Sequence, residues 1–158
     1  MWRLALIAAA AGVLVWLAAA VDVLVVRHRD AVLIEWGIAA GDVFVVGYTH
    51  SVNKSPVADA FEWTGEEIML RQSRFQSLGA GMPHPADFPG SYMYREGDWF
   101  ILSGIDVGMR RIAILVHAYS EQYISLGGER ALLAELAGDG ASIEVEVVAI
   151  PRIKRFRF

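Results

Sequence analysis

The sequence predicts a mainly β fold, an antiparallel β-sandwich or partly closed barrel with one short late helix, preceded by an N-terminal hydrophobic helix. Short runs rich in valine, isoleucine and aromatic residues recur along the chain at the spacing of β-hairpins. Gly, Pro, Asn and Asp separate these runs, and one segment near the end has helical periodicity. The 158 residues include no cysteine, so a hydrophobic core must hold the domain together.

The N-terminus has the composition of an export segment. Residues 4–21 form an apolar run of 18 residues that follows Arg3. A basic start, an apolar centre and the small residues Ala18-Ala19-Ala20 are typical of a cleaved secretory signal. The run is also about long enough, at roughly 18 residues, to cross a bilayer as an uncleaved anchor. We therefore expect residues 1–20 to be a signal peptide or membrane anchor. Residues 21–158 should form a single domain in the periplasm or at the outer face of the cytoplasmic membrane.

The charge balance excludes one class of partner. Of the 14 Lys and Arg residues only Arg3 lies in residues 1–20, which leaves 13 basic and 18 acidic groups, a net charge of −5. This balance gives no reason to expect a nucleic-acid partner. The C-terminal residues 151–158 are locally basic and aromatic. They could be a solvated chain end, or they could contact an anionic membrane surface through Arg152, Lys154, Arg155 and Arg157.

The first strands follow directly after the apolar run. Residues 21–27 are rich in valine and predict a strand, residues 31–36 a second and residues 43–48 a third, with turns at 28–30 and 39–42.

The middle of the chain predicts a hairpin followed by a long irregular segment. Residues 60–63 and 68–72 flank Thr64-Gly65-Glu66-Glu67, a short connection of the kind that closes hairpins. Residues 79–90 contain Pro83, Pro85 and Pro89, which remove backbone donors and exclude a central strand. A long loop in a small domain is usually functional or mobile.

The last third predicts further strands and a helix. Residues 91–95 and 99–102 should form a hairpin about a turn at 96–98. Residues 111–118 should form the clearest buried strand, with Ile112, Ile114 and Val116 on one face and Ala113, Leu115 and His117 on the other.

Residues 129–137 place Leu132, Leu133 and Leu136 three and four apart, which predicts a helix that ends before Gly138. Residues 142–147 then alternate as an edge or half-exposed strand.

Two polar segments contain the candidate functional residues. The first is residues 48–61, a turn-prone stretch between strand-like runs, and the second is the glycine-rich stretch 75–83. Loops on a rigid scaffold often contain binding groups. Together the segments provide nine candidate residues for binding or partner contact: Tyr48, His50, Ser51, Lys54, Asp59, Phe75, Ser77, Gly79 and Gly81.

These residue types suit a small anion or a polar segment of a partner protein. Ser51 donates or accepts a hydrogen bond, Lys54 carries a positive charge and Asp59 a negative one, and His50 adds an imidazole ring. Gly79 and Gly81 would let backbone N–H groups approach a ligand closely. The same residues also have an ordinary structural interpretation, in which the polar side chains cap their own turn and Lys54 pairs with Asp59 at the surface.

The sequence predicts no enzyme, no metal site and no cofactor. His50 and Ser51 are adjacent, so in extended backbone they would point to opposite sides and could not form a catalytic pair. No Gly-x-Ser-x-Gly nucleophile elbow occurs. The spacing of His50, His84 and His117 matches no metal-binding pattern, and His117 is expected to be a core or face residue.

The two segments resemble a known family. The residues that carry the resemblance are Tyr48-x-His50-Ser51-Val52-x-Lys54-x-Pro56-Val57-x-Asp59-x-Phe61 and Arg74-Phe75-x-Ser77-x-Gly79-Ala80-Gly81-x-Pro83. This pattern is similar to domain-of-unknown-function family eighteen-fifty, over about residues 21–150. Ser55 stands where the family leads us to expect threonine, and Asp59 where it leads us to expect glutamate.

The resemblance implies which genes lie beside the gene for this protein, and it implies no mechanism. Members of the family are small exported bacterial proteins often encoded beside TAXI-type TRAP transporters, which pair a solute-binding protein with an ion-gradient-driven permease for organic acids. It implies an accessory protein of such a system, with the permease or the solute-binding protein as its partner. The alternative is an extracytoplasmic protein that binds a small carboxylate near Ser51, Lys54 and the 79–81 backbone, with apolar walls from Tyr48 and Phe75.

Both hypotheses need the two segments to lie together. If the strands beside them are hairpin neighbours, residues 48–61 and 75–83 should meet, with Phe61 and Phe75 pointing inward as apolar anchors. Ordering a polar loop costs about 1–2 kcal/mol per residue, so contacts between the segments would be needed to hold it.

Overall fold

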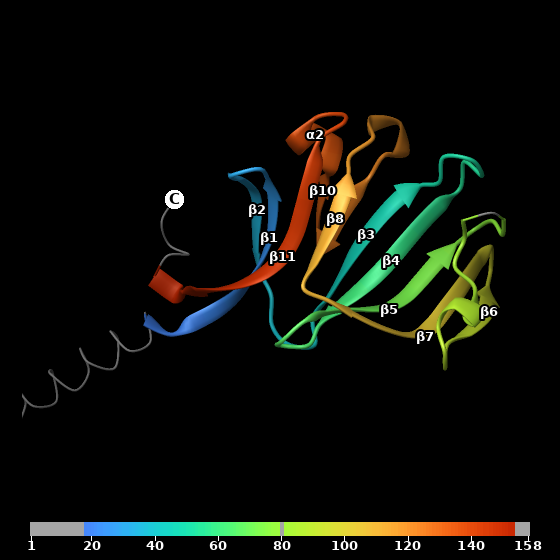
Figure 1. Cartoon of the computed structure of the whole chain (residues 1–158), viewed down its shortest axis with the longest axis horizontal. Coiled ribbons are helices and arrows are strands. Elements are labelled where there is room, and N and C mark those ends of the chain that lie inside the picture. Colours follow the sequence, from blue (N-terminus) through green and yellow to red (C-terminus); the bar gives the residue numbers. More distant parts are fainter. Residues whose placement is uncertain (1–17, 80, 154–158) are drawn as a thin grey trace, which may run out of the picture.

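The computed structural model describes residues 18–79 and 81–153, and these form two antiparallel sheets (Figure 1). The smaller sheet has the strand order β2-β1-β11-β8. Its strands are Ala31–Gly37 (β2), Ala20–His28 (β1), Ser142–Pro151 (β11) and Arg111–Leu115 (β8). Residues 1–17, on which the expected hydrophobic helix falls, lie outside the described part of the chain.

The larger sheet has seven strands in the order β10-β9-β3-β4-β5-β7-β6. Its strands are Glu129–Leu132 (β10), Tyr123–Leu126 (β9), Val43–Thr49 (β3), Pro56–Trp63 (β4), Ile68–Phe75 (β5), Trp99–Met109 (β7) and Tyr92–Glu96 (β6). The two sheets do not join into a closed barrel, so of the two expected architectures only the two-sheet arrangement describes the chain.

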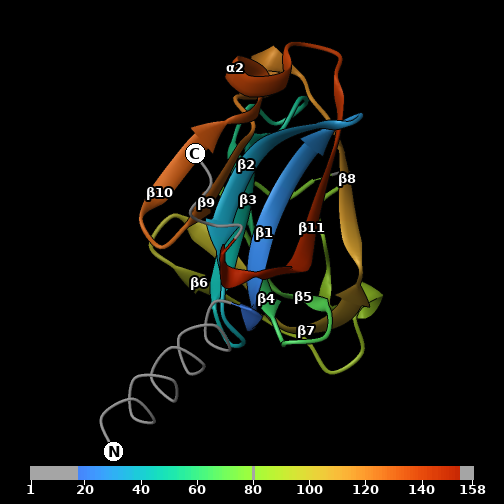
Figure 2. The same ribbon diagram turned by 90° about the vertical axis from the view of Figure 1, so that its left-hand side faces the viewer.

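The main core lies between the two sheets. Leu24 and Val26 of β1 and Ile143 and Val145 of β11 are buried against residues of β3, β4, β5 and β9. In Figure 2 the strands β1, β2 and β11 stand in front of the larger sheet, which agrees with this face-to-face packing. The indole N–H of Trp63 in β4 donates to Asp22 Oδ2 in β1 at 2.8 Å, which links the sheets at one edge of the core.

The larger sheet extends beyond the smaller one and builds a second core there. Val57, Phe75, Leu102 and Ile105 form this second cluster, and Phe88 of the segment after β5 packs on it. That segment contains the short 3-10 helix Pro85–Asp87 (η1) and turns back over the right-hand end of the sheet in Figure 1. The same face of one sheet is therefore covered by the smaller sheet at one end and by a loop at the other.

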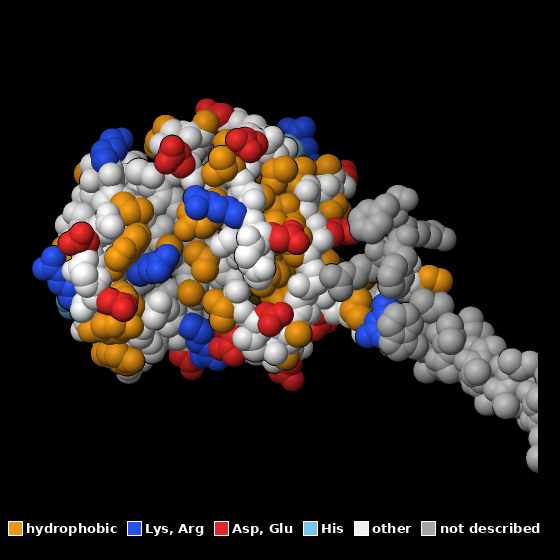
Figure 3. Space-filling view, turned by 180° about the vertical axis from the view of Figure 1, so that it is seen from behind, with side chains coloured by type: hydrophobic (Ala, Val, Ile, Leu, Met, Phe, Trp, Pro, Cys, Tyr) orange, Lys and Arg blue, Asp and Glu red, His pale blue; other side chains and the backbone are white. Residues whose placement is uncertain are grey.

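The chain crosses from the larger sheet to the smaller one between β7 and β8. Strand β7 ends at Met109 and β8 begins at Arg111, so Arg110 alone separates them. Seen from behind, the surface has acidic and basic side chains interspersed with hydrophobic ones rather than one patch of a single sign (Figure 3). Among the described residues, no helix has both the length and the apolar character needed to cross a membrane.

Most of the expected strands are present, several of them longer than the sequence indicated. The hairpin about residues 64–67 forms, with Trp63 opposite Ile68 and the Thr64 hydroxyl accepting from the Glu67 N–H at 3.1 Å. Strand β4 begins at Pro56 rather than at residue 60, and β5 continues to Phe75 rather than ending at residue 72. Eight of the fourteen residues of the first polar segment, 48–49 and 56–61, are therefore strand and not turn.

Two expectations about the last third were wrong. Residues 111–118 are not a buried strand, because β8 is the edge of the smaller sheet and Arg111, Ala113 and Leu115 are exposed. Residues 129–137 are not one helix. Their first four residues form β10, and the helix Leu133–Ala137 (α2) begins only afterwards, ending as expected at Gly138 with a φ of 84°.

The strand expected over residues 142–147 is present and is half-exposed, one of the two alternatives that the sequence left open. It belongs to β11, which pairs with both β1 and β8 and is therefore an interior strand rather than an edge.

Candidate functional site

The first polar segment forms a tight turn organised by His50. The His50 N–H donates to the Ser55 carbonyl and the Lys54 N–H donates to the His50 carbonyl, each at 2.9 Å. The ring nitrogen Nδ1 accepts from the N–H groups of Val52 and Asn53 at 3.3 and 3.2 Å. His50 therefore caps the turn between β3 and β4, which was the ordinary structural interpretation of this residue.

Ser51 and Lys54 lie at the tip of this turn and are exposed. Lys54 has a left-handed backbone, with a φ of 53°, and its Nζ lies 6.0 Å from the centre of the Tyr119 ring. No ion pair between Lys54 and Asp59 occurs among the described residues, because Asp59 points to the covered inner face of the sheet.

The second polar segment lies against this turn. A side chain at Gly79 would stand 3.3 Å from Asn53 Nδ2, and one at Gly81 would stand 3.6 Å from His50 Nε2. Gly81 also has a φ of 82°, in the region that favours glycine. The structure thus brings the two segments together, as the sequence led us to expect.

The aromatic anchors point inward, as expected. Phe61 is buried in the main core and stacks on Phe44, with 5.4 Å between the ring centres. Phe75 is completely buried in the second core and stacks on Phe100 at 6.0 Å. Phe75 therefore supports the second segment from inside and offers no surface to a partner. Ser77 is half-buried, and its hydroxyl donates to the neighbouring Leu78 carbonyl at 3.4 Å.

We call the surface formed by residues 50–55, 76–79 and 81–83 the motif surface. Its most exposed apolar side chains are Val52, which is 75% exposed, and Leu78, which is 55% exposed, one at the tip of each segment. Ser51 and Lys54 lie beside them along the chain. The motif surface therefore offers apolar, hydroxyl and positively charged groups together.

A pocket of about 470 Å³ opens on the inner face of the larger sheet beside the motif surface, and we call it the inner pocket. Its polar lining is Tyr48, Asp59, Ser73 and Asp87. The strand register explains part of this set, since Asp59 lies opposite Ser73 on β5, and Tyr48 is two residues along β3 from Val46, which lies opposite Asp59 on the other side. Leu70, Met82, Phe88 and Ile105 provide apolar walls, and Gly81 and Pro83 complete the rim.

The inner pocket has an unusual electrostatic character. Burial raises the pKa of the Asp59 carboxyl above its ordinary value, and the Ser73 hydroxyl, which lies near the carboxyl without reaching full hydrogen-bonding geometry, opposes this shift. Burial also raises the pKa of the Tyr48 phenol, and the negative charge of Asp59 raises it further. Ser73 is only 2% exposed, and its Oγ reaches hydrogen-bonding geometry with no group of the described residues. A buried hydroxyl without a partner is rare and calls for an explanation.

Ser73 and Asp87 are the polar lining residues of the inner pocket that the sequence did not single out. The strand was expected to end at residue 72, so Ser73 belonged to no element. Continuing the two-residue alternation back from Phe75 would have placed Ser73 on the same inner face.

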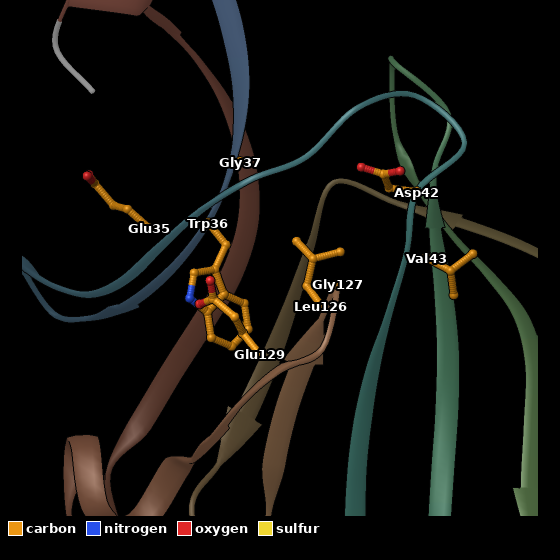
Figure 4. A pocket seen from close by; sticks show the side chains of 8 residues that line it. All are labelled: Glu35, Trp36, Gly37, Asp42, Val43, Leu126, Gly127 and Glu129. Atoms are coloured by element: carbon orange, nitrogen blue, oxygen red, sulfur yellow. The ribbon is translucent and has the colours of Figure 1, made fainter. Parts of the chain in front are cut away.

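A second pocket, of about 350 Å³, lies at the start of β3, whereas the motif surface follows the end of that strand. Figure 4 shows the side chains that line this pocket. It is formed by the end of β2, the start of β3 and the turn between β9 and β10, and it includes Glu35, Asp42 and Glu129. Figure 4 shows Glu35 pointing away from the other labelled side chains, and Asp42 Oδ2 already accepts from the Ala39 N–H at 2.8 Å. These carboxylates do not converge, and the described residues include no cluster suited to a metal ion.

Comparison with known proteins gives one result. No curated protein and no solved structure matches the chain. One family model matches residues 44–133, a narrower range than the resemblance noted over residues 21–150, and this range contains both polar segments and every residue of the inner pocket. Since the match covers more than half of the sequence, the chain belongs to the family described as Domain of unknown function (DUF1850).

Proposed function

We propose that this protein is an accessory component of a TAXI-type TRAP transport system for organic acids. It would contact the permease or the solute-binding protein outside the cytoplasmic membrane. The proposal rests on membership of the family and on the transport neighbourhood that the resemblance implies. The export segment expected at residues 1–20 agrees with an extracytoplasmic place of action.

The observation that favours partner contact is the composition and support of the motif surface. Val52 and Leu78 are large exposed apolar side chains at the tips of two segments that pack on each other. Exposed apolar groups rimmed by polar ones are a feature of protein–protein contact sites. The turn capped by His50 holds one segment in place and the buried Phe75 holds the other, so little conformational entropy would be lost on binding.

Co-purification and solute uptake test the proposal. The double variant Val52→Asp, Leu78→Asp should abolish co-purification of the tagged protein with the permease or the solute-binding protein and reduce uptake to the level of a deletion strain. Leu115→Asp is the matched control, because Leu115 is 54% exposed on the edge strand β8 of the other sheet, and it should retain both properties. Wild-type uptake in a clean deletion strain would rule the proposal out.

A second candidate function is binding of a small carboxylate at Ser51, Lys54 and the backbone near Gly79 and Gly81. The inner pocket adjoins this region through Tyr48 and Gly81, but none of its ten lining residues is basic and two are aspartates. A bound carboxylate would meet like charge there, so the geometry favours partner contact. A rise in Tm with dicarboxylates that disappears in Lys54→Ala would instead establish carboxylate binding.

The membrane-surface contact proposed for the C-terminal tail remains a separate proposal. Lys154, Arg155 and Arg157 lie outside the described residues. Arg152 lies within the described residues, and its backbone N–H donates to the Ala19 carbonyl at 2.9 Å. This bond places the start of the tail beside the start of β1. Flotation of the full chain with anionic vesicles, compared with a chain in which these four basic residues are replaced by serine, tests the contact.

A further inference from the structure

We propose that the inner pocket binds a cationic group, an ammonium or guanidinium on a short apolar stem. The inner pocket shares Gly81, Met82 and Pro83 with the motif surface, but its polar lining comes from other residues, and the proposal does not depend on the transport role.

The first argument is the unpaired carboxylate of Asp59. It lies largely buried on the inner face of the sheet, and none of the described ion pairs includes it. No Lys, Arg or His lines the inner pocket, so the chain provides no counter-charge from within. A buried carboxylate is costly unless a donor or a cation compensates it, and the pocket is the side from which one could reach it.

The second argument is the unsatisfied Ser73 hydroxyl. Ser73 is 2% exposed, faces Asp59 across the β4–β5 pair and lines the pocket, but its Oγ has no hydrogen-bond partner among the described residues. A group that enters the pocket and bonds both Asp59 and Ser73 would remove both deficits at once.

The third argument decides the chemical class of that group. Asp59 is an acceptor when charged, and the Ser73 and Tyr48 hydroxyls can both accept, so the pocket is rich in acceptors. An ammonium has three donors and no acceptor, and a guanidinium has five. An anion would be repelled by Asp59 and by Asp87 at the rim. The Asp87 carboxylate, which accepts from the His84 N–H at 3.0 Å, adds negative charge to the lining of the pocket.

The fourth argument is the wall. Leu70, Met82, Phe88 and Ile105 line the rest of the pocket and leave room for methylene groups behind the charged head. A lysine or arginine side chain from a partner and a free alkylamine share this chemistry, and the experiment separates them.

Binding to the full-length protein in detergent micelles tests the proposal, with n-butylammonium, n-butanol and butyrate as probes in titrations followed by ¹⁵N NMR. We expect n-butylammonium to bind at least tenfold more tightly than n-butanol, and butyrate not to bind. Asp59→Asn should weaken n-butylammonium binding at least tenfold, and Ser73→Ala should weaken it severalfold. Asp98→Asn, which removes an exposed carboxylate from the turn between β6 and β7, should leave it unchanged.

Equal affinity for n-butylammonium and n-butanol, or unchanged affinity in Asp59→Asn, would overturn the proposal, as would binding of none of the three probes. To identify where the cationic group comes from, we compare binding of a blocked tripeptide with a central lysine with binding of the same peptide with a central norleucine. Tighter binding of the lysine peptide than of n-butylammonium indicates a partner's side chain, and its exclusion from the pocket indicates a free amine. Both results agree with a cation site.

Discussion

Asp59 is a residue whose burial lowers the stability of the fold and at the same time leaves a charge available for a ligand. Its carboxylate is removed from water without a cation to compensate it, which destabilises the folded chain while leaving a charge free for a ligand. The shorter aspartate, where the family leads us to expect glutamate, keeps this charge close to the sheet and to Ser73. A functional role for Asp59 would therefore come with a lower free energy of unfolding.

The pH dependence of stability checks this cost. The native pKa of Asp59 is raised above the ordinary value of 3.8, so the native state holds this proton more tightly than the unfolded chain. The associated stability is fully present below the unfolded pKa and is lost as the pH rises through the native pKa. Asp59→Asn is neutral at every pH, so its Tm should exceed that of the wild type at pH 7 and converge with it near the ordinary value.

Circular dichroism melts between pH 3 and pH 7 measure the difference, with Asp98→Asn as a control that should show no such trend. A lower Tm for Asp59→Asn at pH 7 would mean that the carboxylate has a stabilising partner.

At the scale of elements, the β3–β4 hairpin depends on a side chain inside its own turn. His50 Nδ1 accepts two backbone N–H groups that would otherwise lie unpaired at the tip. This capping role leaves Nε2 directed toward Gly81, so the same ring spaces the two polar segments. The element that presents the motif surface is therefore held by one of the residues first considered for binding.

Replacing His50 tests this role. His50→Ala should destabilise the fold by roughly 1–2 kcal/mol, because two hydrogen bonds worth about 0.5–1.5 kcal/mol each are lost. His50→Asn should recover part of the loss, since an amide oxygen can accept the same N–H groups. Urea denaturation gives the stability. Faster hydrogen exchange at Val52 and Asn53 in His50→Ala, reversed in His50→Asn, distinguishes capping from general packing, and unchanged exchange would exclude it.

The elements that the sequence failed to predict are those that long-range pairing decides. Residues 129–132 were expected to be helical because they precede leucines at helical spacing. Gly127 and Gly128 instead turn the chain so that Glu129 pairs with Leu126, and residues 129–132 form a strand. Pro56 lies in the stretch expected to be turn-prone, but a proline is tolerated as the first residue of a strand, where it pairs with Thr49. The local sequence pattern located the hairpins, but it did not decide which strand each segment would pair with.

The same limit applies to the candidate site. The meeting of the two segments could be predicted, because their strands are neighbours in sequence. The inner pocket could not, because its walls come from β5, from β7 and from the loop that follows β5. Two packed sheets were expected, but which strands belong to each sheet was equally hidden, since β1 pairs with β11 across more than a hundred residues. Residue type alone does not report such distant pairings.

At the scale of the whole molecule, two apolar clusters share one continuous sheet. Strands β4, β5 and β7 contribute to the second cluster, and β4 and β5 also reach the main core. Loosening one end should therefore loosen the other, and the domain should unfold as a single cooperative unit.

Truncation at the second cluster tests this cooperativity. Phe75→Ala should destabilise the whole domain by about 3–5 kcal/mol, as core aromatic truncations do. In urea, ¹⁹F signals of fluorotryptophan at Trp63, in the main core, and Trp99, near the far end of the sheet, should be lost together. Ser51→Ala and Lys54→Ala should change stability by less than about 0.5 kcal/mol. Loss of the Trp99 signal at a lower urea concentration than the Trp63 signal would show two separately unfolding halves.

The pairing of β1 with β11 has a consequence for orientation. Ala20 lies opposite Pro151, so the chain enters and leaves the described domain at one pole, and Figure 1 shows the hairpin of β3 and β4 ending toward the other. A tether attached ahead of β1, such as the proposed membrane anchor, would hold the protein by one pole and present the motif surface at the opposite one. The motif surface would then lie about one domain length from the membrane, and a partner would have to extend that far to contact it.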